Sequence, residues 1–520
     1  MDSSSPVHLE LGSSIPQDSK YATLSHCWGE YKPVQLLSSN IVSFFDYIDY
    51  TTLSKTFQDA ITTVRVLGIQ YIWIDSLCII QDSTEDWSKE SLSMKSVYYF
   101  SYLNIAATAA YDGREGLFFP HTPHHDEDMQ AAFTVHSNHF RVIDPNYWHN
   151  TLERLPLFSR AWIYQERIIT PRTLHFAQNS IAWDCGGGCR LSETFPVQTI
   201  DVEGARPLKD LAERLYVGCS NEIARAVLYK SWTHHVKEYT KCQLTFPTDK
   251  LIGLAGIARQ IEVPVCVVDN FHGYFAGLWE GDMLNQLLWY VHNGSKRLGE
   301  EDNVYIAPSW SWASSHPNAV NFHSDDVPQG DYTHTSRDLA TVVTIDRNSS
   351  EEFGVQNPGG FIILQTRICE ASLIYNTDEA RCGCCSPEHF NRFSTFFPGT
   401  TFADEPSNAR FRPDMSFEDK ECGFKVKNLY CIPLVEDVFE VQGGKFWTWA
   451  TGLVVVRDEV EEGVFRRWGS WKCSFENVKG GLGVLESGFE RFDCGEGLAW
   501  AGEVSEGGNE EARTYHVKII

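Results

Sequence analysis

Residues 21–29 read Tyr-Ala-Thr-Leu-Ser-His-Cys-Trp-Gly, a run that predicts a β-strand up to the tryptophan and a break at the glycine. Successive side chains of a strand point to opposite faces of a sheet. Ser25 and Cys27 therefore share one face, and His26 and Trp28 share the other. Because His26 and Cys27 point apart, we do not expect them to act together as a cysteine–histidine dyad.

The segment after this strand predicts a parallel βαβ unit. Apolar residues recur at three- and four-residue spacing after Ser54, and Gly68 stands where helix C-termini are favoured, so a helix is expected between them. Residues 71–74, Tyr-Ile-Trp-Ile, have the composition of a buried strand. Sites in such units open at the carboxyl ends of the strands, where Asp75 stands.

Further elements of the same α/β type follow. Ser83 is placed to begin a second helix, and residues 103–107 predict a third strand. Ser159 is expected to cap a later helix, on which Trp162 and Glu166 share one face because they are four residues apart. Two closing strands are then expected, at residues 173–176 and 181–183.

The second half of the chain has a different pattern. Residues 232–258 predict a helical run interrupted at residues 245–250, which include a proline, and residues 274–290 predict another helix. Trp310 and Trp312 stand at strand spacing. From about residue 340 the apolar runs are short and separated by turn residues, which predicts strands. The expected domains are a flexible arm at 1–17, an α/β domain at 18–190, a helical Trp-rich extension at 191–335 and a β-rich region at 336–520.

The length and composition are typical of a folded protein with more than one domain. A chain of 520 residues with 42% hydrophobic residues is folded and exceeds what one core usually organises. A net charge of −26 repels nucleic acid and anionic lipid, so neither is expected as a partner. We find no export signal and no apolar run of 18 residues or more, and therefore expect a cytoplasmic protein without a membrane span.

Neither the cysteines nor the histidines predict a metal site. The 15 cysteines include clusters at 185–189 and 381–385, but neither cluster has the paired spacing of a zinc site, so buried thiols are expected. Residues 120–140 predict a surface insertion, whose histidines lack ligand spacing and favour a solvated loop. These histidines are His121, His124, His125 and His136. The commonest phosphate-loop, lipase and zinc-protease motifs are also missing from the sequence.

Three motifs together resemble the fungal heterokaryon-incompatibility (HET) domain. They are Leu-Ser-His-Cys-Trp-Gly at 24–29, Trp-Ile-Asp-Ser-Leu-Cys-Ile-Ile-Gln at 73–81 and Ser-Arg-Ala-Trp-Ile-Tyr-Gln-Glu at 159–166. Flanking residues 104–108, 116–118 and 309–312 are also similar to that family. One departure is Ile80, where the family commonly has asparagine. The resemblance covers residues 18–190 as the domain, with similar flanking sequence to about residue 315.

The resemblance implies self/non-self recognition that triggers programmed cell death through protein partners, including homo-oligomers. HET domains are also similar to TIR domains, which implies a flavodoxin-like parallel sheet. Some TIR domains are NAD glycohydrolases that use the glutamate of a Ser/Trp/Glu helix motif. Ser159, Trp162 and Glu166 look like the counterparts, with Glu166 in the catalytic place and NAD as substrate rather than cofactor.

The chemistry of such a site can be stated from the residue types. Breaking the nicotinamide–ribose bond builds positive charge on the ribose, which one carboxylate, here Glu166, can stabilise. Trp28 and Trp73 are candidate aromatic walls, and Asp75 is a candidate for orienting a ribose hydroxyl. Ser25, Ser159 and Trp162 complete the candidate substrate-binding residues.

Structural interpretations of the same residues stay open beside these. The tryptophans can be core residues, Asp75 can cap the following turn, and Glu166 can pair with Arg160 or Arg167. Three functions therefore remain: an NAD-cleaving cell-death effector, a non-catalytic signalling module that acts by assembly, and a hydrolase that uses Cys27 or Cys78.

Overall fold

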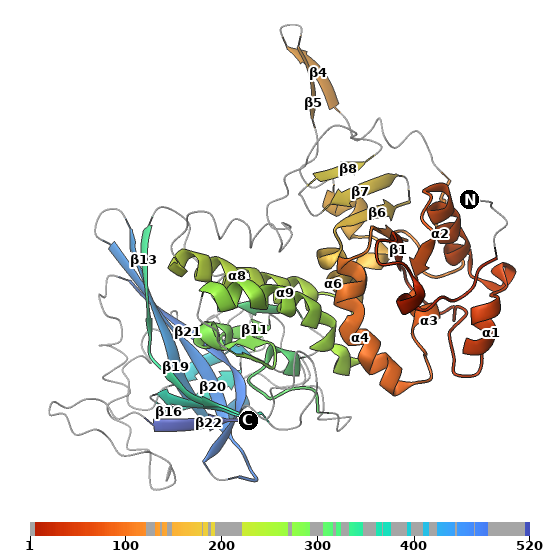
Figure 1. Ribbon diagram of the computed structural model, residues 1–520. Coiled ribbons are helices and arrows are strands. Elements are labelled where there is room, and N and C mark those ends of the chain that lie inside the picture. The colour runs from red at the N-terminus through yellow and green to blue at the C-terminus, as the bar shows by residue number, and fades with distance from the viewer. Residues whose placement is uncertain are drawn as a thin grey trace. The chain divides into compact units, whose positions relative to one another are not determined.

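The chain divides into two compact units, which we describe separately. Unit 1 comprises Met1–Ala224, Cys242–Leu244 and Ile252–Pro264, and unit 2 comprises Arg225–Lys241, Thr245–Leu251 and Val265–Ile520. The computed structural model (Figure 1) describes residues 6–120, 131–135, 138–142, 148–178, 180–185, 189–192, 221–268, 273–291, 305–315, 319–323, 332–346, 360–366, 368–375, 393–396, 409–414, 424–441, 445–461, 463–476 and 515–520.

Unit 1 is built on a mixed sheet whose first four strands are parallel. The strands are β1 (Tyr21–Ser25), β2 (Tyr71–Trp73), β3 (Leu103–Ala106), β6 (Arg172–Phe176), β7 (Ile181–Cys185) and β8 (Cys189–Ser192), in the order β2-β1-β3-β6-β7-β8. β1, β2, β3 and β6 are parallel, and β7 and β8 add antiparallel pairs at one edge. The chain passes from β1 to β2 on one side and then to β3 on the other, so the strand order reverses at β1. Ligand sites in open α/β sheets lie at the carboxyl ends of the strands beside such a reversal.

Helices of unit 1 begin where polar side chains cap them. Ser54 accepts a hydrogen bond from the N–H of Phe57, and Ser83 accepts one from Asp86, which confirms the two predicted helix starts. The helices are α1 (Ile41–Asp46), α2 (Lys55–Val66), α3 (Asp75–Cys78), α4 (Thr84–Tyr99) and α6 (Ala161–Ile169), with short turns η1 (Gly12–Ser14), η2 (Tyr50–Thr52), η3 (His149–Glu153) and η4 (Pro156–Ser159).

The alternation of β1 separates two environments. Ala22 and Leu24 lie in the main core with Phe57 and Ile61 of α2. Cys27, just beyond the strand, lies instead in a cluster with residues of β3, η4 and α6, namely Ala106, Leu157 and Ile163. The odd-numbered side chains of this stretch thus face α6, and the even-numbered ones face α2. The prediction that neighbouring residues here point to opposite faces is confirmed.

Three local predictions in unit 1 need correction. The first strand ends at Ser25, three residues earlier than predicted, because the chain turns away there toward Gly29, which has a φ of +58°. Ser159 does not cap α6: the helix begins at Ala161 after Arg160, and Ser159 lies in the preceding turn η4. Part of the predicted insertion is a hairpin of β4 (Ala131–Val135) and β5 (Asn138–Val142), while its four histidines lie outside the described residues.

Two longer helices follow, α8 (Asn221–Tyr239) and α9 (Ile252–Val268), with the short turn η5 (Pro247–Asp249) between them. This confirms the helical run predicted at residues 232–258 and its interruption near the proline. Among the helices of the described residues, none is both long and apolar enough to cross a membrane.

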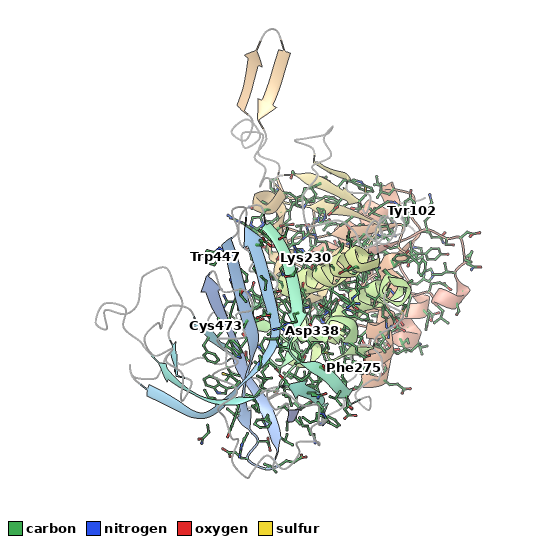
Figure 2. All side chains as sticks on the ribbon, turned by 90° about the vertical axis from the view of Figure 1, so that its left-hand side faces the viewer. Tyr102, Lys230, Phe275, Asp338, Trp447 and Cys473 are labelled. Atoms are coloured by element: carbon green, nitrogen blue, oxygen red, sulfur yellow. The ribbon has the colours of Figure 1, made fainter. Side chains whose placement is uncertain are left out.

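The helix predicted at residues 274–290 is wrong. This segment forms the hairpin β9 (Tyr274–Phe275) and β10 (Leu278–Trp279), the turns η6 (Glu280–Asp282) and α10 (Met283–Gln286), and the strand β11 (Trp289–Val291), which pairs with β12 (Val320–Phe322). Phe275, which is labelled in Figure 2, marks the first strand of this hairpin. Positive φ angles at Ala276 and Gly277 close the hairpin and are incompatible with a helix.

Buried tryptophans surround this hairpin. The indole N–H groups of Trp232 and Trp312 both donate to the carbonyl of Gly277, at 3.1 and 2.9 Å. Trp310 and Trp312 are fully buried, but the expected strand is missing there: Trp312 begins the 3₁₀ turn η7 (Trp312–Ser314). The tryptophans of this region are core residues.

The remainder of unit 2 is a large sheet, which confirms the β-rich C-terminal region. Its path runs β14-β15-β22-β21-β20-β19-β16-β17, with β13 on β19 and β18 on β21. Trp447 and Cys473 lie on two of its long strands (Figure 2). The strands are β13 (Tyr332–Asp338), β14 (Thr341–Ile345), β15 (Ile362–Thr366), β16 (Cys369–Tyr375), β17 (Phe393–Phe396), β18 (Ala409–Pro413), β19 (Phe424–Val441), β20 (Lys445–Arg457), β21 (Val464–Glu476) and β22 (Tyr515–Ile519).

The turn after β1 depends on the absence of a side chain at Gly29. A Cβ atom there would lie 2.5 Å from Cβ and 2.7 Å from a backbone oxygen of the loop at Asp112 and Tyr111. Gly68 has a similar φ of +72° but open space around it. Both alanine substitutions incur the left-handed backbone penalty of about 1–2 kcal/mol, and only Gly29→Ala adds a steric clash. We expect Gly29→Ala to lower the melting temperature by several degrees more than Gly68→Ala; equal shifts would contradict the close approach.

Candidate functional site

The end of β1 meets α6 through a buried hydrogen bond. The hydroxyl of Ser25 donates to Oε2 of Glu166 at 2.5 Å, and the two residues are 2% and 6% exposed. They come from the first and third sequence motifs, 141 positions apart. The structure thus brings together two of the predicted site residues.

Asn104 of β3 orients this pair. Its Nδ2 donates to the Ser25 hydroxyl at 3.0 Å, and its Oδ1 accepts from the Thr23 hydroxyl, also at 3.0 Å. The Ser25 oxygen also lies 3.2 Å from Oδ1 of Asn104, and we assign its single hydroxyl hydrogen to the shorter contact with Glu166. Asn104 is not among the predicted site residues, although it is a polar residue inside the apolar strand Leu103–Ala106 and begins the stretch 104–108 that is similar to the HET family.

A second set of contacts centres on Asp75, at the carboxyl end of β2. The indole N–H of Trp28 donates to Oδ2 of Asp75 at 2.9 Å, and the backbone N–H of Ser76 donates to Oδ1 at 2.7 Å. Nε2 of His26 lies 3.8 Å from the same Oδ1. Asp75 therefore bonds to the first turn of α3, in agreement with the structural interpretation, and it also holds Trp28, a contact that was not predicted.

The two sets together occupy the carboxyl ends of β1 and β2, beside the reversal of strand order. Residues 21–166 match the family model described as Heterokaryon incompatibility protein (HET). This stretch of the chain is a HET domain. Its matched region begins with β1 and ends at Glu166, so it spans the residues of both contact sets. Comparisons with curated proteins and with solved structures gave no significant match.

The carboxyl group of Glu166 in the HET domain titrates near neutrality. Burial is the largest cause and raises its pKa to about 7, and the negative charge of Asp75 raises it further. Hydrogen bonds from Ser25 and Tyr98, and the charge of Arg160, act in the opposite direction. A carboxyl group with such a pKa is present in both protonation states near pH 7, as acid–base and charge-stabilising groups in active sites often are.

The predicted ion pairs of Glu166 are not what the structure shows. Arg167 pairs with Glu153 at 2.6 Å, and Nη1 of Arg160 donates to the carbonyl of His26 at 2.7 Å. Glu166 accepts from Ser25 instead. The carboxyl group is therefore buried without the neutralising partner that a structural ion pair would supply at contact distance.

The remaining candidates differ in their placement. The ring of Trp73 packs edge-on against Tyr98 at 5.7 Å between centroids, and Tyr98 reaches Glu166. Trp162 is half-buried on α6, four residues before Glu166. Ser159 is exposed, and its hydroxyl donates to the carbonyl of Pro156 at 2.7 Å. The structure gives Ser159 a local bond in the turn before α6 and does not bond it to Glu166.

The two candidate thiols are poorly suited to nucleophilic attack. Burial raises the pKa of Cys27, and it raises the pKa of Cys78 to about 12. Reactive cysteines require the thiolate, which depressed rather than raised pKa values provide. The hydrolase hypothesis that used these cysteines thus loses its physical basis.

Burial of Glu166 makes a prediction about stability and pH. Its folded pKa of about 7 exceeds the usual 4.5, so its contribution to stability is complete below pH 4.5 and is lost as pH rises to about 7. Glutamine does not ionise, so the Glu166→Gln variant does not lose this stability as the pH rises. We expect the variant to gain melting temperature relative to wild type between pH 5 and 8, with a free-energy difference on the order of 3 kcal/mol.

The control is Glu85→Gln, which removes an exposed carboxylate in the first turn of α4. Its melting temperature should differ from that of wild type by a nearly constant amount over the same pH range. Parallel curves for wild type and Glu166→Gln would show that Glu166 titrates normally and would contradict the site described above.

Proposed function

We propose that this chain is a cell-death effector of the heterokaryon-incompatibility type, whose HET domain cleaves NAD at the nicotinamide–ribose bond. The family match supports a heterokaryon-incompatibility-type function. The observation that carries the enzymatic part is the buried Ser25–Glu166 pair, in which a carboxyl group with a pKa of about 7 lies at a reversal of strand order.

The topology of the sheet supports the proposed likeness to TIR domains. The order of the parallel strands, β2-β1-β3-β6, is the order in which flavodoxin-like sheets begin. In such sheets the ligand binds at the carboxyl ends of the first and third strands. Ser25 ends β1 at this edge of the sheet, and Asp75 follows β2 on the other side of β1. The position of Ser25 therefore supports nucleotide binding more directly than that of Asp75 does.

The chemistry needs one well-placed carboxylate. When the bond between C1′ of the ribose and the pyridinium nitrogen breaks, its electron pair stays with nitrogen and nicotinamide leaves neutral. The ribose carries the positive charge until water adds to C1′ and releases a proton, which gives ADP-ribose. Ionised Glu166 would stabilise that charge, and the low polarity of its surroundings strengthens the effect.

Neighbouring groups would then position the substrate. Trp28 and Trp73 are half-buried and supply aromatic surface beside the carboxyl group of Asp75. Ser25 keeps Glu166 in one orientation and, because its hydrogen bond lowers the pKa, favours the ionised form that the reaction requires. Asn104 directs the Ser25 hydroxyl, so it is a positioning residue in this scheme.

One observation favours a second candidate function, a non-catalytic signalling module that acts through protein–protein contacts. Glu166 is only 6% exposed, so a substrate reaches it only if the residues that cover it move. If they do not move, Ser25 and Glu166 are a buried structural pair, and cell death would depend on assembly with protein partners or with other copies of the chain.

Nicotinamide release separates the two functions. We expect purified wild-type protein to release nicotinamide from NAD, with a rate that rises through pH 7 as Glu166 ionises. Glu166→Gln should be slower by about 100-fold or more, because a charge-stabilising group is lost. Chromatography at several protein concentrations provides the measurement, since assembly can be required for activity.

Glu85→Gln, which changes an exposed glutamate, is the matched control and should keep the wild-type rate. Equal activity of wild type and Glu166→Gln would contradict the assigned role. If neither protein releases nicotinamide, even when fused to an oligomerising domain, the signalling module becomes the better account.

A further inference from the structure

His26 carries a buried nitrogen that the surrounding fold does not satisfy. Its side chain is 2% exposed, and Nε2 has no hydrogen-bond partner among the described residues. The nearest charged atom is Oδ1 of Asp75, at 3.8 Å, which is too far for a hydrogen bond. Buried polar atoms are nearly always paired, so an unpaired one in a candidate site needs an explanation.

The protonation of the ring decides what this nitrogen offers. A backbone hydrogen bond to Leu24 involves the imidazole, and since Nε2 is unpaired, Nδ1 is the atom that makes it. Burial is the largest influence on the pKa of His26 and lowers it; the charge of Arg160 also lowers it, whereas Asp75 raises it. In the neutral ring with Nδ1 protonated, Nε2 presents a lone pair toward a carboxylate oxygen.

The groups packed around the pair do not supply a hydrogen-bond donor to Nε2 of His26. The edge of the imidazole packs against the ring of Phe57 at 5.0 Å between centroids, which fixes its plane. Arg160 donates from Nη1 to the backbone carbonyl of His26 and makes no hydrogen bond to Nε2. Trp28 donates to Oδ2 of Asp75 and the N–H of Ser76 donates to Oδ1, so Oδ1 keeps one lone pair for a further donor.

Asp75 is the exposed member of the pair. Its side chain is 29% exposed, compared with 2% for His26, so a ligand contacts Asp75 directly and reaches Nε2 of His26 only when the side chains that cover it shift. A ligand that satisfies both acceptors must bring two hydrogen-bond donors. Two hydroxyls on adjacent ring carbons meet this requirement, each at about 2.8 Å from its acceptor.

We propose that Oδ1 of Asp75 and Nε2 of His26 accept the two hydroxyl hydrogens of a ribose cis-diol. In the choice of a ribose this rests on the proposed function, since NAD carries two such diols, whereas the need for two donors follows from the acceptor pair itself. His26 then acts as a specificity-determining residue that distinguishes a ribose from a deoxyribose.

Binding without turnover tests this. Titration calorimetry on the full-length Glu166→Gln protein would compare NAD with two analogues, each lacking the 2′-hydroxyl of one ribose. We expect one of the analogues to bind about tenfold more weakly, as loss of a hydrogen bond to a buried acceptor implies. That analogue also identifies which ribose is bound.

Two variants of His26 locate the effect. His26→Gln can place an oxygen acceptor where Nε2 lies and should keep the discrimination between NAD and the analogue. His26→Phe has a similar shape, retains the contact with Phe57 and lacks the acceptor, so NAD and the analogue should bind it equally. Melting temperatures of both variants show that the comparison is made on folded protein.

The outcomes separate this inference from the proposed function. Hydroxyl-dependent binding that His26→Phe abolishes supports the inference, whether or not wild type hydrolyses NAD. Equal binding of NAD and both analogues, unchanged discrimination in His26→Phe, or no binding of NAD overturns it, even if wild type releases nicotinamide.

Discussion

A carboxyl group buried against a serine hydroxyl is the constraint on which the site depends. Removing Glu166 from water disfavours its ionised form, and the fold limits this effect through Ser25, Tyr98 and the charge of Arg160. These groups come from β1, α4 and the turn before α6, so the pair forms only when the sheet and two helices are assembled together. Folding and the chemical properties of Glu166 are therefore coupled.

The period of a single strand organises both contact sets. Ser25 points toward α6 and meets Glu166, while His26, one position later, packs against Phe57 of α2 and approaches Asp75. Ser25 thus contacts the buried carboxyl group of Glu166 on one face, and His26 approaches the more exposed carboxylate of Asp75 on the other. Asp75 links the sets electrostatically, since its charge acts on both Glu166 and His26.

Local sequence patterns predicted the elements that depend on local physics. Ser54 and Ser83 cap their helices because a side-chain oxygen there meets nearby backbone N–H groups, and the strands were short apolar runs. The segment 274–290 was misread because its apolar spacing fits a helix, whereas positive φ at Ala276 and Gly277 and the buried tryptophans impose a hairpin. Ser159 failed as a cap because its hydroxyl bonds back to Pro156.

The site was predictable only in part, because its contacts join residues that are far apart in the sequence. Ser25, Asp75 and Glu166 were named from motifs and strand ends, but Asn104 was not, since its contact with Ser25 joins residues 79 positions apart. The unpaired Nε2 of His26 could not be predicted either. The alternation of a strand predicts which face a side chain is on, but not which atoms it contacts there.

Direct titration of Glu166 tests the account most closely. Infrared difference spectra between wild type and Glu166→Gln, recorded from pH 5 to 9, isolate the carboxyl band of this one residue. The account predicts half-ionisation near pH 7, and a higher midpoint in the Ser25→Ala background, because burial then acts without the opposing hydrogen bond. A midpoint near the usual 4.5, or one that Ser25→Ala leaves unchanged, would contradict it.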